Sequence, residues 1–349
     1  MDYIKLGVIG VGRMGKNHCR IYSSLPRVEL VGVHDQDQEL GRCIGQQHQV
    51  PFYAEVDELL EHVDAVSIVT PTPTHFDLAM RCLDRGVHVL VEKPITETLE
   101  QAELLVRAAE GCRLVVQVGH IERFNPTYTE LKHVLETPGM SPLVINFRRL
   151  SPYQGSNTDV DVVWDLMIHD LDLVLDLMGV EPVSVQAQGL RVFSGEVDHA
   201  VAHFVFGPAT NGSLGASALG TSEQGPLLTA TASRITEQKV RSIEVMAREA
   251  YVEGDLLNKA ISVHRRTVGE YLNLNHQGVT YRQESITERI YVPIFEPLFL
   301  ELQHFVECVR EGKPTQVPAR DGLRAVRLAT TIRAALRQDL MDPAGIRSY

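Results

Sequence analysis

The chain has 349 residues, of which 44% are hydrophobic, and its formal net charge at pH 7 is −12. This length exceeds one ordinary hydrophobic core and predicts two domains. The negative charge is spread along the chain without a basic run, which excludes a protein specialised for binding nucleic acid. The sequence contains no run of roughly eighteen apolar residues and no signal-peptide pattern at its start. We therefore expect a cytoplasmic protein with no membrane partner.

The cysteines predict the redox environment. There are five of them, scattered along the chain and without Cys-x-x-Cys spacing. This pattern is typical of reduced thiols, most of them packed in cores, in a reducing compartment.

The first expected element leads into a glycine motif. An apolar strand that opens at residue 4 ends at Ile9, and Gly10, Gly12 and Gly15 follow before a helix expected to begin near Met14. In a dinucleotide-binding βαβ unit the first glycine allows a tight turn and the second lets the backbone approach the pyrophosphate. The third lets the helix pack closely on the strand. The pyrophosphate then binds free N–H groups at the start of the helix.

A second apolar strand, at 28–33, is followed by an acidic residue, Asp35. A carboxylate at this point accepts hydrogen bonds from both ribose hydroxyls and repels a 2′-phosphate, so it favours NAD over NADP. A glycine-rich turn without a ligand is the alternative. Strand, helix, second strand and Asp35 in this spacing together favour a bound dinucleotide.

Strands and helices continue to alternate to about residue 120. We expect further strands near 52 and at 65–69, 87–91 and 114–118, and helices at 55–60, 75–83 and 99–109. Six strands with crossover helices predict a doubly wound parallel sheet, the Rossmann architecture. Capping boxes are expected at Thr74 and Thr98, and helix C-caps at Gly86 and Gly111.

The pattern changes at about residue 140. Strand-like runs lie at 143–150, 183–190, 200–206, 213–219, 228–233 and 242–245, with one clear helix among them at 162–178. They predict an α+β domain with a large, mostly antiparallel open sheet. Two helices follow, at 297–310 and 321–336, and are placed to pack back on the first domain. We expect a Rossmann domain over 1–123 and a substrate-binding and oligomerisation domain over 124–349.

Ligands of open α/β sheets bind at the carboxyl ends of the strands. The fourth strand ends at Thr70, Thr72 and His75, among prolines that block regular structure. The fifth ends at Glu92 and Lys93, where the lysine could hold a substrate hydroxyl and help to remove its proton. A salt bridge to Glu92 or another carboxylate is the alternative for Lys93. We expect the cofactor to be lined by Gly10, Gly12, Arg13, Met14, Asp35, Thr70, Thr72, His75, Glu92 and Lys93.

The sixth strand is followed by Arg123, which we expect near the domain junction. The forked donors of an arginine suit an anionic or polyhydroxyl ligand. An ion pair between the domains is an equally good interpretation.

The helix at 162–178 has acidic and histidine side chains at intervals of four, four, three and four residues: Asp161, Asp165, His169, Asp172 and Asp176. A solvated helix face explains such a stripe. The functional alternative is that Asp165 orients His169 and raises its basicity, which leaves the second ring nitrogen free as a general base. Zinc or manganese ligation is a further alternative, but no other histidines or cysteines cluster in the sequence, so we expect no metal.

Taken together, these motifs resemble those of the Gfo/Idh/MocA oxidoreductases over nearly the whole chain. The resemblance implies NAD(P)-dependent oxidation or reduction of a sugar or cyclitol carbon, by dimers or tetramers. It makes Lys93 the strand-end lysine, Asp165 the orienting acid and His169 the general base. The motifs that carry it are Gly10-x-Gly12-x-x-Gly15, Thr70-Pro71-Thr72-x-x-His75, Glu92-Lys93-Pro94, Gly119-x-x-x-Arg123-Phe124-x-Pro126, Asp165-x-x-x-His169-Asp170, Gly312-Lys313-Pro314 and Gly322-Leu323.

Within this family the stretch 149–172 looks most like bacterial sugar-nucleotide members, in particular UDP-N-acetylglucosamine 3-dehydrogenases. These precede an aminotransferase in lipid A precursor synthesis. The resemblance implies that Arg123, Arg148 and Tyr153 bind the diphosphate or the sugar, beside Lys93, Asp165 and His169. A dehydrogenase or reductase of a free sugar or cyclitol is the alternative within enzymes. The alternative outside enzymes is a nucleotide-sensing regulator without turnover. The presence of both Lys93 and His169 argues against that alternative.

Overall fold

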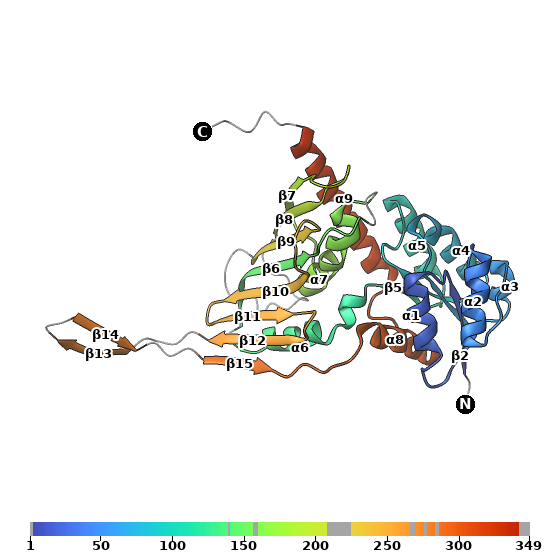
Figure 1. Cartoon of the computed structure of the whole chain (residues 1–349), viewed down its shortest axis with the longest axis horizontal. Coiled ribbons are helices and arrows are strands. Elements are labelled where there is room, and N and C mark those ends of the chain that lie inside the picture. The colour runs from blue at the N-terminus through green and yellow to red at the C-terminus, as the bar shows by residue number, and fades with distance from the viewer. Residues whose placement is uncertain are drawn as a thin grey trace. The chain divides into compact units, whose positions relative to one another are not determined.

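The computed structural model describes residues 3–138, 140–155, 160–207, 225–265, 270–275, 278–282 and 286–341. The chain divides into two compact units, whose elements are labelled in Figure 1. The first unit comprises 1–124 with 295–330, and the second comprises 125–294 with 331–349. All five cysteines are free. None of the described helices is long and apolar enough to cross a membrane.

The first unit is built on a parallel sheet in the order β2-β1-β3-β4-β5. Its strands are β1 (Ile4–Ile9), β2 (Val28–His34), β3 (Ala65–Ile68), β4 (His88–Glu92) and β5 (Val116–Gly119). The central strands β3 and β4 are almost wholly buried. Burial on both faces explains why these strands are recognisable in the sequence as short, continuous apolar runs.

The third expected strand, near residue 52, is reduced to a single bridge between Val33 and Phe52. The carbonyl of Pro51 accepts from Val33 N at 3.1 Å, and Tyr53 N donates to the Val33 carbonyl at 2.9 Å. Pro51 itself has no N–H with which to extend the ladder. The expectation of six full strands is therefore wrong by one. If the bridge is counted, the order is that of a dinucleotide-binding sheet, which reverses between β1 and β3.

The described helices of the first unit are α1 (Arg13–Tyr22), α2 (Gln38–His48), α3 (Val56–Leu60), α4 (His75–Asp84), α5 (Leu99–Gly111), α8 (Pro297–Glu311) and the first part of α9 (Ala319–Met341). The capping box at Thr98 is confirmed, with Gln101 as its second member. The one expected at Thr74 is wrong, because the Thr74 hydroxyl donates to Thr70 and to the Pro71 carbonyl instead. Helix α2, which the sequence did not predict, starts at Asp37, whose carboxylate accepts two backbone N–H groups.

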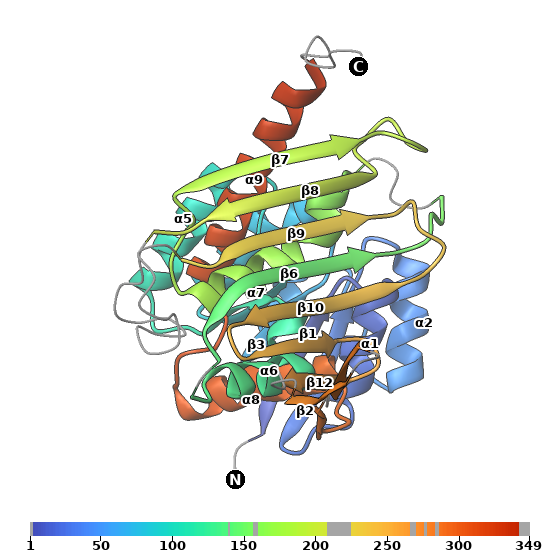
Figure 2. The same ribbon diagram turned by 90° about the vertical axis from the view of Figure 1, so that its left-hand side faces the viewer.

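The second unit is built on an eight-stranded sheet in the order β15-β12-β11-β10-β6-β9-β8-β7. Figure 2 shows it face-on, with α7 behind the strands. Only the described pair β6–β9 is parallel, so the expectation of a mostly antiparallel open sheet is confirmed. The expected strand at 213–219 lies outside the described residues. The strands are β6 (Pro142–Leu150), β7 (Ser184–Leu190), β8 (His199–Val205), β9 (Leu227–Ser233), β10 (Val240–Ala247), β11 (Ala250–Asp255), β12 (Ala260–Arg265) and β15 (Ile286–Ile290).

Helices and a separate hairpin accompany the large sheet in the described part of this unit, which also includes the end of α9. Helix α6 spans Pro126–Leu135, and β13 (Glu270–Asn275) pairs with β14 (Gly278–Arg282) as a separate two-stranded sheet. In place of one regular helix at 162–178, the chain forms a π-helical segment, Val163–Met167, which continues as α7, Ile168–Met178. Such π-helical insertions are uncommon and occur frequently at functional sites.

The two faces of the large sheet differ in chemistry. Along β6 the side chains of Phe147 and Arg149 point to the buried face, where Arg149 bonds to Asp170 of α7. The side chain of Arg148 points to the opposite face, because successive residues of a strand alternate. On the face of the sheet that α7 covers, Arg149 of β6 can therefore hold α7 in place. Arg148, on the other face, cannot.

Candidate active site

The glycine turn after β1 has three glycines with three different environments. Gly10 has φ of +89°, and a Cβ there would lie 2.6 Å from the Val69 carbonyl oxygen. A Cβ on Gly15 would collide with the Gly10 carbonyl oxygen, so Gly15 allows α1 to pack on the turn. A Cβ on Gly12 would meet no atom within 4 Å. The fold therefore requires Gly10 and Gly15, whereas Gly12 borders space that the protein does not fill.

That space lies at the start of α1, which is suited to an anion. Gly12 occupies the N-cap position, and no side chain caps the helix. The backbone N–H groups of the first turn, at Arg13 and Met14, thus face a position where a diphosphate is stabilised by the helix dipole. The residues present fit the pyrophosphate of a dinucleotide.

Asp35 lies beside this turn at the end of β2. Its Oδ2 accepts from Val11 N at 2.7 Å, and its Oδ1 accepts from Asp37 N at 2.9 Å. Each carboxylate oxygen has two acceptor positions, so these backbone bonds leave capacity for ribose hydroxyls. Asp35 thus holds the glycine turn in addition to the role predicted for it.

We expect Asp35→Ser to weaken NADH binding by roughly 10- to 100-fold, since charge-assisted hydrogen bonds are lost, and to reduce the preference for NADH over NADPH. Fluorescence titration with both cofactors measures this. Asp37→Asn, which keeps a capping side chain on α2, is the matched control and should leave the preference unchanged. Equal affinity of the wild type for NADPH and NADH would show that Asp35 does not select the cofactor.

The segment after β3 is tied to the segment after β4. The two ring nitrogens of His75 each lie 2.8 Å from a carbonyl oxygen, one of Pro94 and one of Thr70. His75 is buried, and burial lowers its pKa although the two carbonyls act in the opposite direction. It thereby holds the two strand ends together, whereas Thr72 is more exposed in a short 3₁₀ turn. Direct contact of Thr70, Thr72 or His75 with the cofactor remains a prediction.

Lys93 at the end of β4 is half-buried beside an acidic group. Glu92 Oε1 lies 3.3 Å from His18 Nε2, and Glu92 Oε2 accepts from Lys93 N at 3.2 Å. Burial by itself would raise the pKa of Glu92, but the hydrogen bond of His18 and the charges of His18 and Lys93 outweigh it and hold the pKa below its usual value. His18, on the buried face of α1, was not predicted from the sequence. The result is a carboxylate held next to the strand-end lysine.

Arg123 is buried in the first unit. Its Nη2 donates to Asp321 Oδ2 at 3.2 Å, and its side chain is 3% exposed. The structure thus shows an ion pair within the first unit, whereas the interpretation from the sequence placed it between domains. Binding of substrate by Arg123 remains a prediction.

Asp161 organises the start of the helical segment that carries Asp165 and His169. Its Oδ1 accepts from Val163 N and Trp164 N, both at 3.0 Å. A solvated face, one of the alternatives open from the sequence, does not hold for Asp161, which is buried in this capping role, or for Asp172, which is also buried. The π-helical segment also changes the angular spacing of these residues from that of a regular helix. Asp165 and His169 are both half-buried.

An arginine from the last helix secures the same segment. Arg333 Nε donates to Asp161 Oδ2 at 2.5 Å, and its guanidinium lies 5.4 Å from the centroid of the Trp164 ring. Capping and cation–π contact therefore fix the turn that precedes Asp165.

The two adjacent arginines of β6 have different surroundings. Arg149 is 2% exposed and makes a forked contact with Asp170, its Nη2 donating at 2.7 Å and its Nε at 3.0 Å. Arg148 is 46% exposed and pairs with Glu244 on the sheet face opposite α7. Binding of substrate by Arg148 remains a prediction. Tyr153, beyond the end of β6, contacts Phe193 with the two rings tilted and their centroids 4.8 Å apart. Residues 156–159 of this stretch lie outside the described residues.

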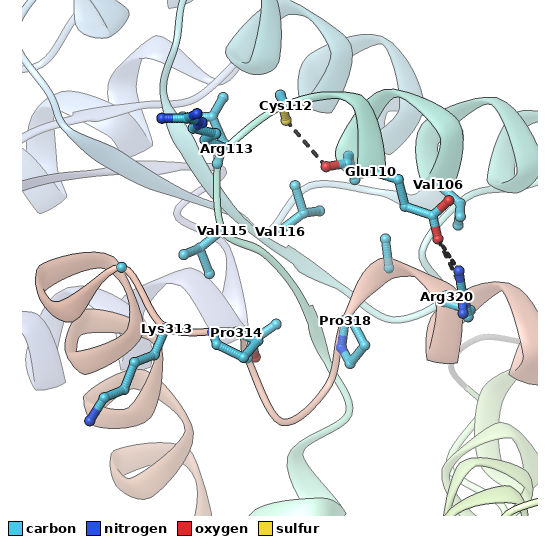
Figure 3. Close-up of a pocket in the computed structure, with 15 residues that line it drawn as sticks. Val106, Glu110, Cys112, Arg113, Val115, Val116, Lys313, Pro314, Pro318 and Arg320 are labelled. Carbon is cyan, nitrogen blue, oxygen red and sulfur yellow. Dashed lines mark hydrogen bonds and ion pairs between the residues drawn. The ribbon is translucent and has the colours of Figure 1, made fainter.

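A cavity of about 420 Å³ lies elsewhere in the first unit, at the amino end of β5 (Figure 3). Val115, Val116, Pro314 and Pro318 line it, and the Glu110–Arg320 ion pair lies at its edge. In a parallel sheet the carboxyl ends of all strands share one edge, so this cavity is at the opposite edge from Gly10 and Lys93. It has no part in the candidate active site.

Comparisons with known proteins point to one family. Residues 4–120 match the family model described as the Gfo/Idh/MocA oxidoreductase family with an NAD-binding Rossmann fold, and 148–253 match the Gfo/Idh/MocA C-terminal domain. The chain is 31% identical to a UDP-N-acetylglucosamine 3-dehydrogenase of Acidithiobacillus ferrooxidans, over 96% of this chain and 98% of that protein. A solved structure of that enzyme has a TM-score of 0.82, at 30% identity, and covers 97% of this chain and 100% of its own. A scyllo-inositol 2-dehydrogenase (NAD(+)) of Bacillus subtilis is 28% identical over 89% of this chain and 87% of its own.

Proposed function

The chain belongs to the Gfo/Idh/MocA family of NAD-binding oxidoreductases, and we propose that it is a nucleotide-sugar dehydrogenase. Its proposed substrate is UDP-N-acetylglucosamine, oxidised at the 3-hydroxyl to a keto sugar. The observation that carries this proposal is the match to a UDP-N-acetylglucosamine 3-dehydrogenase along nearly the full length of both chains. Several inositol 2-dehydrogenases match over little more than half of this chain.

In the proposed mechanism His169 takes the proton of the substrate hydroxyl as general base. Asp165 orients the imidazole and stabilises the imidazolium that forms. Lys93 donates a hydrogen bond to the same oxygen and stabilises negative charge on it while the carbonyl forms. NAD, when bound, accepts the hydride that leaves the substrate carbon.

Features around these residues support the roles. The helical segment that presents Asp165 is fixed at its start by Asp161 and Arg333, so its side chains have a rigid base. Lys93 follows Glu92, whose carboxylate accepts from Lys93 N at 3.2 Å and has its pKa held below its usual value by His18 and Lys93. Gly12 leaves room for the diphosphate of NAD.

The same proposal includes the product and the assembly. A 3-keto sugar is an electrophile that an aminotransferase converts to an amine, so we infer such an enzyme as the next step, in the synthesis of a cell-envelope lipid such as lipid A. We further propose that the chain works as a homodimer or homotetramer. A dehydrogenase of a free cyclitol is the second candidate, favoured by the inositol dehydrogenases among the relatives.

A substrate panel tests the proposal. Purified protein is incubated with NAD and either UDP-N-acetylglucosamine, UDP-glucose, myo-inositol, scyllo-inositol or glucose, and NADH absorbance is followed. We expect turnover of UDP-N-acetylglucosamine, with a 3-keto product identified by mass spectrometry after amine trapping. Efficient turnover of a cyclitol or free sugar, with none of any UDP-sugar, would instead establish the second candidate.

We expect Asp165→Asn to lower turnover by about 10²–10⁴-fold, because the amide no longer stabilises the imidazolium of His169. Binding of NADH, measured by fluorescence, should be unchanged. Asp77→Asn, at an exposed position of α4, is a control that should retain full activity. A strong chelator should leave the wild type active. Loss of activity with chelator that zinc or manganese restores would make Asp165 and His169 metal ligands rather than an acid–base pair.

A further inference from the structure

The loop between β7 and β8 is built around a buried carboxylate. Asp198 Oδ2 accepts from the backbone N–H groups of Val192, Phe193 and Ser194 at 2.7, 2.7 and 3.0 Å. Asp198 Oδ1 accepts from the Ser194 hydroxyl and from Arg234 Nε, both at 2.7 Å. Burial alone would raise the pKa of Asp198, but these bonds hold it well below its usual range. These five hydrogen bonds hold the loop backbone around one carboxylate.

This fixed loop presents an aromatic ring to solvent. The side chain of Phe193 is 56% exposed, and that of Tyr153 is 36% exposed. Their ring centroids are 4.8 Å apart with planes inclined at 39°. The Phe193 ring is held on the fixed loop and contacts the Tyr153 ring at a tilt, so part of the conformational entropy of this aromatic surface has already been lost on folding.

The aromatic pair lies beside the helical segment of the proposed active site. Val162 N, directly before that segment, donates to the Val197 carbonyl of the same loop at 3.0 Å. Ser151 N, two residues before Tyr153, donates to the Ser233 carbonyl at 2.9 Å, and Arg234 N donates to the Asp198 carbonyl at 2.9 Å. Tyr153, Phe193 and the start of the Asp165 segment thus share one edge of the second unit, at the carboxyl ends of β6 and β9.

Arginine side chains lie close to this loop. Arg191 is on the loop itself, and Arg333 and Arg337 are on α9. A small hollow of about 30 Å³ is lined by Asp161, Arg191, Glu196, Val197, Arg333, Leu336 and Arg337. Arg333 is paired with Asp161. Arg191, two residues from Phe193, is exposed and has no ion-pair partner among the described residues. The lining of the hollow holds three arginines and two acids, in a chain whose net charge is −12, so it is locally more positive than the chain as a whole.

We propose that Tyr153 and Phe193 stack on the base of a nucleotide-linked sugar and that Arg191 contacts its phosphates. A base offers a flat π face to an aromatic ring, and a phosphate matches the forked donors of a guanidinium. The sugar end of the substrate then extends toward the helical segment with Asp165 and His169. This inference rests on the proposed function, and it assigns the nucleotide half of the substrate to residues 153, 191 and 193.

Calorimetry on the NADH-saturated full chain tests it with two ligands, UDP and N-acetylglucosamine 1-phosphate, which lacks the base. Phe193→Ala should weaken UDP binding by roughly 5- to 150-fold, the effect of losing one stacked base, and leave N-acetylglucosamine 1-phosphate within about twofold. Phe193→Tyr should retain UDP affinity, because the π face is kept. Tyr291→Ala, which removes an aromatic side chain that is 80% exposed elsewhere in the same unit, is the control. Arg191→Ala should weaken both ligands.

Other outcomes overturn the inference in distinguishable ways. If Phe193→Ala weakens both ligands equally or neither, stacking on the base is refuted while UDP binding and the proposed function stand. If Phe193→Ala leaves UDP affinity intact but changes the mass measured by light scattering, the aromatic pair belongs to an interface between copies of this chain. If the wild type binds no UDP and oxidises a free cyclitol, the proposed function and the inference both fail.

Discussion

Replacing His169 by alanine should lower turnover by about 10²–10⁴-fold, the usual contribution of a positioned general base. In the proposed mechanism no other side chain accepts the proton, so hydride departure would leave the substrate oxygen without a base. Lys93→Ala should cause a loss of similar size, because the developing negative charge on that oxygen loses its donor. Neither change removes a described contact of the glycine turn. Binding of NADH and the Tm should therefore remain close to those of the wild type.

Steady-state kinetics with the substrate found in the panel, NADH titration and thermal unfolding measure the three quantities separately. His133→Ala is the control, since His133 lies on α6 with its side chain 62% exposed. Near-normal kcat in His169→Ala would remove His169 from the role of base. Unfolding of either variant would indicate that the lysine or the histidine is structural.

We expect Arg149→Met to destabilise the protein by about 3–5 kcal/mol, because it leaves the Asp170 carboxylate buried without its counter-charge. Arg149 and Asp170 are 2% and 3% exposed, so water does not replace the lost donors. Asp170→Asn should have an effect in the same range, since it removes the negative charge that the buried guanidinium of Arg149 contacts.

The adjacent residue provides the control. Arg148→Met removes an exposed pair with Glu244, which contributes at most about 1 kcal/mol. Urea unfolding curves of the three variants measure the free energies of unfolding. If Arg148→Met and Arg149→Met lose equal stability, the argument from burial is refuted.

The parallel strands of the first unit could be predicted because burial on both faces produces continuous apolar runs. The strands β11, β12 and β15 were not predicted. Their residues alternate between the buried and the open face, as Val252 and Glu253 do on β11, and each strand is only five or six residues long. A short alternating run of this kind is hard to distinguish from a loop with scattered apolar residues.

In the site, too, features formed by neighbouring residues could be predicted from the sequence, whereas contacts between distant residues could not. The roles of Gly10 and Gly15 follow from their spacing, because both act within one turn of the chain. The His18–Glu92 contact joins residues 74 positions apart and has no signature in either segment. A shift of one residue in a strand moves a side chain to the opposite face, so the sequence alone does not show that Arg148 is exposed and Arg149 buried. The π-helical segment was read as α-helix because acids at intervals of four residues fit a regular helix well.

The position of Trp164 has a spectroscopic consequence. It is the single tryptophan of the chain, it directly precedes Asp165, and the guanidinium of Arg333 lies against its ring. Indole emission is sensitive to a nearby cation, so the intrinsic fluorescence of the whole protein reports on one turn of one helix. Uridine nucleotides do not emit in that range. A change of tryptophan emission on addition of UDP or a UDP-sugar would therefore arise at the segment that presents Asp165 and His169, without any label being introduced.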